Sequence, residues 1–169
     1  MKKLLAVRND KLGDLILTLP ALKIIKSSVP DIEIDLLVND KYSDIQLITD
    51  YIDNVICLND NLIDDIASRN YDYSISFFST FDTGYKLWRS NIKKRYAPAT
   101  KLAQIFYNKK IKQNRSTSLK SEYEYNNDLA KYFLRDNFYR LGSPDNAYIS
   151  LKKTIDASDK TKKLIFIHP

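Results

Sequence analysis

The sequence predicts an α/β fold built on a parallel sheet with helices on both faces. Short apolar runs of strand length alternate with longer stretches whose apolar residues recur at helical spacing, the pattern of successive βα units. The chain has 169 residues, 44% of them hydrophobic and 28% charged, which suits a domain with a buried core. βα units in series imply a parallel sheet with helices on both faces.

Five apolar runs are predicted as strands, namely residues 4–7, 32–38, 54–58, 71–78 and 92–99. The intervening helices are predicted over residues 14–28, 42–50, 62–69 and, after a loop, within 81–90. A long helix is expected over 121–142, with Ser121 as its cap, Glu124 as capping-box partner and Gly142 as its stop. Residues 100–120 are polar and basic and are expected to form a loop or lid.

The last part of the chain is expected to differ from the first. Residues 1–145 account for the α/β domain, and 146–169 are expected to be a linker followed by the first strand of another βα unit. That final apolar run carries His168, the single histidine.

The composition excludes several classes of protein. Cys57 is the single cysteine, so an intrachain disulfide is excluded, and in its apolar run it is predicted to be a core residue. One histidine and one cysteine cannot form a metal cluster, so no metal is expected. The N-terminal apolar run is too short for a signal peptide, and the sequence has no apolar run of about 18 residues that could span a membrane. These features predict a cytoplasmic protein.

Positive charge is concentrated in one segment. Eleven of the 27 Lys and Arg residues, and no acidic residue, lie between Thr83 and Ser121. Such a segment attracts anions, which could be phosphorylated sugars, an anionic membrane surface or nucleic acid. Aromatic residues lie within it, as nucleic-acid surfaces require, although a solvated loop explains the charge equally well. These residues are Trp88, Tyr96, Phe106 and Tyr107.

The loop after the first strand is the strongest candidate site. Ligands of open α/β sheets bind at the carboxyl ends of the strands, and residues 9–14 lie there. With Gly13 as its one glycine, the loop matches neither the GxGxxG fingerprint nor a P-loop. Asp14 is either the N-cap of the following helix or a general base. Arg8, at the end of the strand, is either a surface charge or a contact for an anion.

Pro20 indicates that the helix after this loop is irregular. A proline beyond the first turn deletes a backbone hydrogen bond and costs about 3 kcal/mol in an ideal helix. The helix is therefore expected either to kink at Pro20 or to begin later, with Thr18 as its cap.

Residues 4–40, LLAVRNDKLGDLILTLPALKIIKSSVPDIEIDLLVND, resemble the opening of glycosyltransferase family 9, the ADP-heptose:lipopolysaccharide heptosyltransferases. The segments YIDNVICLND, YDYSISFF and the closing LIFIHP are also similar to family elements, as is the spacing from GYK to RY. The resemblance implies a GT-B enzyme with two Rossmann-like domains, of which this chain is the N-terminal, acceptor-binding one. It also implies inverting transfer from a nucleotide-sugar such as ADP-heptose to a lipopolysaccharide or other glycan core, without metal or cofactor.

The resemblance assigns roles to particular residues. Asp14 matches the family's general base, and Arg8 matches a basic position on the acceptor side. We predict further acceptor contacts from Asn9, Lys11, Gly13, Lys86 and Arg95, and a donor contact from His168. The implied acceptor is a phosphorylated glycolipid, so the basic segment suits peripheral contact with the inner face of the cytoplasmic membrane.

The chain alone is expected to transfer little sugar, because the donor domain lies beyond its end. The alternative is a non-catalytic α/β module that binds an anionic glycan, a membrane or another anionic partner. Nucleic acid is the least favoured partner, since the basic segment alone supports it.

Overall fold

The structure is a computed structural model that describes residues 1–99, 103–115 and 119–138. Its centre is a six-stranded sheet of order β3-β2-β1-β4-β5-β6, in which every neighbouring pair is parallel. The strands are β1 (Lys2–Val7), β2 (Ile32–Val38), β3 (Asn54–Cys57), β4 (Tyr73–Ser76), β5 (Lys94–Pro98) and β6 (Lys109–Ile111). The predicted Rossmann-like α/β fold is confirmed.

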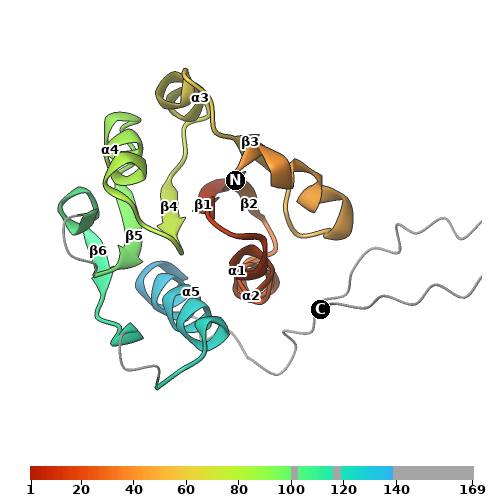
Figure 1. The fold of residues 1–169 in the computed structure, drawn as a ribbon, viewed down its shortest axis with the longest axis vertical. Helices are drawn as coiled ribbons and strands as arrows, with labels where there is room; N and C mark the ends of the chain where they lie inside the picture. The colour runs from red at the N-terminus through yellow and green to blue at the C-terminus, as the bar shows by residue number, and fades with distance from the viewer. Residues whose placement is uncertain (100–102, 116–118, 139–169) are drawn as a thin grey trace, which may run out of the picture.

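Helices cover both faces of this sheet, as expected (Figure 1). The α-helices are α1 (Leu12–Ile16), α2 (Leu19–Ser28), α3 (Leu62–Ser68), α4 (Phe81–Arg89) and α5 (Glu122–Phe138). The described residues also include the 3-10 helices η1 (Asp40–Ile48) and η2 (Ala103–Phe106). In Figure 1, α2 and α5 lie on one side of the sheet, and α3 and α4 lie on the other.

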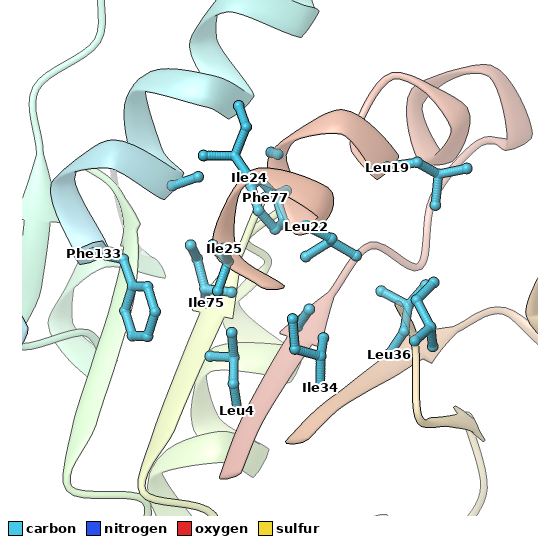
Figure 2. Close-up of a cluster of buried hydrophobic side chains, with 14 of the residues drawn as sticks. Leu4, Leu19, Leu22, Ile24, Ile25, Ile34, Leu36, Ile75, Phe77 and Phe133 are labelled. Atoms are coloured by element: carbon cyan, nitrogen blue, oxygen red, sulfur yellow. The ribbon is translucent and has the colours of Figure 1, made fainter. Parts of the chain in front are cut away.

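The core has one apolar layer on each side of the sheet. On the α2 and α5 side, Leu22 and Phe133 are fully buried against strand residues such as Leu4 (Figure 2). On the α3 and α4 side, Ile66 and Leu87 belong to the second layer. Strands buried on both faces explain why the sequence shows continuous apolar runs rather than alternation.

The order of the strands creates a switch point between β1 and β4. The chain runs outward from β1 through β2 to β3 and then crosses to β4, on the other side of β1. Crevices form at the carboxyl ends of the strands where the order reverses in this way. The loops that follow β1 and β4 therefore meet at the place where a ligand is expected.

The prediction for residues 100–120 is wrong in its described parts. They include η2 and the sixth strand, β6, rather than a continuous loop. The sequence hides this strand because it has three residues, two of them lysines, and an edge strand needs no long apolar run. The strand and linker predicted within 146–169 lie outside the described residues.

Candidate active site

The chain after β1 forms two short helices rather than one. Helix α1 ends at Ile16 and α2 begins at Leu19, with Thr18 as its N-cap. Pro20 is thus in the first turn of α2, where its missing N–H costs nothing. The alternative in which Thr18 begins a later helix is confirmed, although its hydroxyl donates back to the Asp14 carbonyl (2.9 Å) instead of capping α2.

Asp14 is not the N-cap of α1. That position is Lys11, which makes no side-chain cap, and Asp14 lies inside the first turn. The capping interpretation is therefore wrong, because the helix begins two residues earlier than the apolar pattern indicates. The Asp14 carboxylate therefore does not cap the helix, and it pairs with Arg8 instead.

Arg8 is the centre of the site, and it is buried rather than a surface charge. Its side chain is 3% exposed, and Nη1 donates to the Phe77 carbonyl just beyond β4 (3.1 Å). This bond joins the β1 and β4 loops across the switch point. Three carboxylates surround the guanidinium: Asp10 at 2.8 Å from Nε, Glu122 at 2.9 Å from Nη1, and Asp14 at 3.3 Å from Nη2.

Of these three carboxylates, Asp14 is the most exposed and lies farthest from the Arg8 guanidinium. Its side chain is 32% exposed, against 14% for Asp10 and 24% for Glu122, and its distance to the guanidinium is the longest. Glu122 accepts a hydrogen bond from Arg8, and Asp10 forms an ion pair with it that is not aligned as a hydrogen bond. These two carboxylates hold Arg8 in place, while Asp14 is oriented by Arg8 and still meets solvent. A carboxylate oriented and exposed in this way can accept a proton from a bound hydroxyl group.

Glu122 connects this cluster to α5, more than a hundred residues along the chain. Its carboxylate also pairs with Nη1 of Arg115 at 2.8 Å, so two cations share it.

The start of α5 is fixed by the predicted capping box, which is confirmed. The Ser121 amide donates to Glu124 (2.7 Å), and the Glu124 amide donates to the Ser121 hydroxyl (3.3 Å).

Asn126 braces the break between α1 and α2 from the same helix. This residue is fully buried, and its amide nitrogen donates to the Leu17 carbonyl and to the Thr18 hydroxyl, both at 3.2 Å. The break has backbone groups that neither short helix satisfies, and Asn126 supplies one partner. Helix α5 thus positions Asp14 from two points, through Glu122 and through Asn126.

The remaining loop residues surround Asp14. Asn9 is partly buried, and its side-chain oxygen has no hydrogen-bond partner among the described residues. Lys11 is exposed. Gly13 has a negative φ, and a Cβ placed on it would meet nothing within 4 Å, so neither conformation nor crowding requires glycine there. The surface beside Asp14 is open.

The structure does not bring Lys86 and Arg95 to Asp14. Lys86 is on α4, where it pairs with Asp82 at 2.8 Å. Arg95 donates to the Phe106 carbonyl (2.6 Å) and to the Ile92 carbonyl, and burial lowers the pKa of its guanidinium. Both belong to the α4 side of the sheet, so their role in acceptor binding stays a prediction. His168 lies outside the described residues, and its donor contact also stays a prediction.

Asp10, Glu122 and Asn126 were not predicted as site residues. A weak signal existed for Asp10, which is in the same loop as Arg8 and Asp14. Nothing local marks Glu122 or Asn126, because an acidic residue in a first helical turn is ordinary. Among the described residues, no group of three or more His, Cys, Asp or Glu could hold a metal ion. No described helix is long and apolar enough to cross a membrane.

Comparison with known proteins relates the chain to glycosyltransferases. It is 37% identical to a Haemophilus influenzae protein named "Putative glycosyltransferase", and the match covers 99% of this chain and 54% of that protein. The chain therefore spans about half the length of this relative. No protein-family model matches the sequence.

Solved heptosyltransferases share the fold. E. coli heptosyltransferase WaaC with ADP superimposes with a TM-score of 0.69 at 20% identity, over 85% of this chain and 50% of that one. E. coli ADP-heptose lps heptosyltransferase II gives 0.67 at 13% identity, over 77% and 40%. A glycosyl transferase family 9 protein from Veillonella parvula gives 0.65 at 18% identity, over 78% and 40%. The predicted resemblance is confirmed: the chain is a relative of glycosyltransferases and has the fold of one half of a family 9 enzyme.

Proposed function

We propose that the chain is the acceptor-binding half of a family 9 glycosyltransferase, with Asp14 as its general base. The observation that carries the proposal is the unequal sharing of Arg8 among three carboxylates, which leaves Asp14 oriented but partly exposed at the switch point of the sheet. The relation to a glycosyltransferase at 37% identity supports the same class of reaction.

The proposed reaction uses Asp14 as the group that accepts the proton. Its carboxylate takes the proton from an acceptor hydroxyl, and the oxygen forms a bond to the anomeric carbon of the donor sugar. The bond from that carbon to the diphosphate breaks on the opposite face, so the nucleotide leaves and the configuration inverts. The transition state has oxocarbenium character, as in glycoside hydrolysis.

Arg8 is a positioning residue in this scheme. Asp10, Glu122 and the Phe77 carbonyl occupy two sides of its guanidinium, and the remaining nitrogen faces Asp14. Asn9 and Lys11 are proposed to contact the acceptor from the same loop. Gly13 leaves open space through which the acceptor can approach Asp14.

The proposed donor is a nucleotide-sugar. One solved relative is E. coli heptosyltransferase WaaC with ADP-2-deoxy-2-fluoro heptose, which suggests ADP-heptose as the first donor to test. The donor is expected to bind mainly to the half of the enzyme that this chain does not span. The proposed acceptor is a phosphorylated glycolipid core.

The test is sugar transfer by the chain joined to the donor half of its H. influenzae relative. Transfer from ADP-heptose to a lipid-linked core is expected for the wild type and is expected to fall by about 10²- to 10⁴-fold in Asp14→Asn. Lys41→Gln, an exposed change at the β3 end of the sheet, is the control and should keep full turnover. Unchanged turnover in Asp14→Asn would reject Asp14 as the base.

A further inference from the structure

Helix α4 carries an exposed row of aromatic side chains. Phe81, Tyr85 and Trp88 are spaced by four and three residues, so they lie on one side of the helix. Their exposed fractions are 55%, 41% and 50%. The other side of the helix is packed normally, with Thr83 and Leu87 buried. The exposure is therefore a property of one face and not of a loosely attached helix.

A fourth ring from η2 completes this surface. Phe106 contacts all three rings, with centroid distances of 4.8 Å to Phe81, 5.9 Å to Tyr85 and 6.2 Å to Trp88. We call these four residues the α4 aromatic face. Three of its rings are at least 41% exposed although they pack against one another, so the surface is ordered and still open to a partner.

The backbone of the protein is adapted to hold Phe106 there. A Cβ on Gly84 would lie 3.1 Å from the Phe106 ring and 3.2 Å from the Tyr107 ring, so glycine allows η2 to approach α4. Arg95 fixes η2 from the other side by donating to the Phe106 carbonyl at 2.6 Å. Gly84 and Arg95 thus both hold η2 against α4.

Positive charge borders the α4 aromatic face. Arg89 follows Trp88 on the helix and is exposed. On β6, Lys109 pairs with Asp136 of α5, so the alternation of the strand directs Lys110 to the α4 side. Within the described residues, neither Arg89 nor Lys110 pairs with a carboxylate. Lys86 is the third cation, and it forms an ion pair with Asp82, the single acidic residue of α4.

We propose that the α4 aromatic face docks on a bilayer that contains anionic phospholipid. Tyr and Trp favour the interface between headgroups and acyl chains, because their rings are apolar and carry one polar group. Lys and Arg around them are attracted to anionic headgroups. Phe106 packs edge to face against Phe81 and Tyr85, with interplanar angles of 78° and 73°, and Trp88 is tilted by 39° to Phe106 and by 43° to Tyr85. None of these contacting pairs is parallel, so the face does not offer a series of parallel flat surfaces on which successive bases could stack. The inference extends the proposed function, since a lipid-linked acceptor would lie at the same surface.

Trp88 makes the docking directly measurable, because it is the only tryptophan in the chain. Its fluorescence is excited selectively and followed as vesicles are added to the 169-residue chain. With phosphatidylcholine and phosphatidylglycerol together, we expect a blue shift and quenching by lipids brominated near the headgroup. With phosphatidylcholine alone, we expect binding at least about tenfold weaker. No sugar transfer is involved, so this result is independent of the test of Asp14.

Paired variants separate this face from the rest of the surface. Phe81→Ser with Tyr85→Ser keeps Trp88 as probe and is expected to weaken vesicle binding at least about tenfold. Leu119→Ser, at an apolar residue elsewhere that is even more exposed, is expected to bind as the wild type does. Arg89→Gln should weaken binding by about fivefold, and Lys41→Gln should not. Circular dichroism checks that each variant is folded.

Three outcomes would overturn the proposal. The first is vesicle binding without any change in Trp88 emission, which would place the contact elsewhere. The second is a Trp88 response that does not require anionic phospholipid, whether it is an equal response to neutral vesicles or a response to a single-stranded oligonucleotide and none to vesicles. The third concerns the chain joined to a donor half. If its Trp88 emission is already blue-shifted relative to the 169-residue chain and does not change when vesicles are added, the donor half itself covers this face.

Discussion

Two buried clusters of charge lie in the same sheet, and they are built in opposite ways. In the first, the buried cation Arg8 is shared by three carboxylates at the carboxyl ends of β1 and β4. In the second, the buried carboxylate Asp35 of β2 is surrounded by donors. It accepts from the Tyr71 hydroxyl and from Asn54 (2.8 Å), and Arg69 lies 3.7 Å away.

From this difference we infer that the Asp35 cluster is structural and that the Arg8 cluster serves the proposed function. Around Asp35 one negative charge meets one positive charge and two neutral donors, and its exposure is 1%. Burial and the bond to Asp35 raise the pKa of Tyr71, which keeps this hydroxyl a donor. Around Arg8, three carboxylates meet two cations, Arg8 and Arg115, and one carboxylate remains exposed. Stability alone does not require that third carboxylate, so its presence favours a chemical role.

Replacing Arg8 should have the largest effect on stability. Arg8→Met leaves three carboxylates without their shared cation, and losing one side of a buried ion pair costs about 3–5 kcal/mol. The free energy of unfolding is measured by urea denaturation. Arg89→Met, an equal change at an exposed residue, should stay within about 0.5 kcal/mol of the wild type. Equal effects of the two changes would refute the central place of Arg8.

The Asp35 cluster should be nearly as sensitive, but only structurally. Asp35→Ala leaves the Tyr71 hydroxyl and the Asn54 amide without their acceptor, at a cost of about 3 kcal/mol. The exposed Asp44→Ala is the matched control in urea denaturation. In the chain joined to a donor half, turnover per folded molecule should be unchanged. A specific loss of turnover would break the distinction between the two clusters.

A smaller, pH-dependent effect on stability is expected at Asp136, a carboxylate that, like Asp35, accepts hydrogen bonds from neighbouring side chains. The hydrogen bond from Tyr96 lowers its pKa, and Lys109 acts in the same direction. A carboxyl group with a lowered pKa stabilises the fold above its unfolded pKa, about 3.9, and loses that contribution as the pH falls through the folded value. Asp136→Asn should therefore cost about 1 kcal/mol near neutral pH and progressively less below about pH 4. A cost independent of pH would contradict the assignment.

The smallest effects are expected at two glycines. Gly84→Ala crowds Phe106 and Tyr107, whereas Gly13→Ala meets nothing. Both changes raise helix propensity by the same amount, so the crowding at Gly84 is what distinguishes them. The free energy of unfolding of Gly84→Ala should therefore be about 1 kcal/mol lower than that of Gly13→Ala. If the open surface at Gly13 admits the acceptor, Gly13→Ala should also raise the KM for the acceptor in the joined enzyme. An unchanged KM would remove Gly13 from the proposed site.

The sequence predicts the sheet well and the site partly, for physical reasons. Strands such as Ile32–Val38 are buried on both faces and so appear as unbroken apolar runs, whereas Lys109–Ile111 pairs at the edge without an apolar pattern. Asp14 and Arg8 could be assigned to one candidate site because the carboxyl end of the first strand is recognisable, and the structure brings their side chains to 3.3 Å. Their roles stay predictions. The bond between Arg8 and Glu122 joins residues 114 positions apart, and no local pattern carries such a contact.

The central claim is that, of the carboxylates on Arg8, Asp14 serves chemistry and Glu122 serves structure. The direct measurement compares Asp14→Asn with Glu122→Gln in the joined enzyme, recording turnover per folded molecule and the free energy of unfolding together. Asp14→Asn should lose about 10²- to 10⁴-fold in turnover, with stability within about 0.5 kcal/mol of the wild type. Glu122→Gln should lose about 2 kcal/mol of stability and keep far more of its turnover. Full turnover in Asp14→Asn, or a loss explained by unfolding, would contradict the claim.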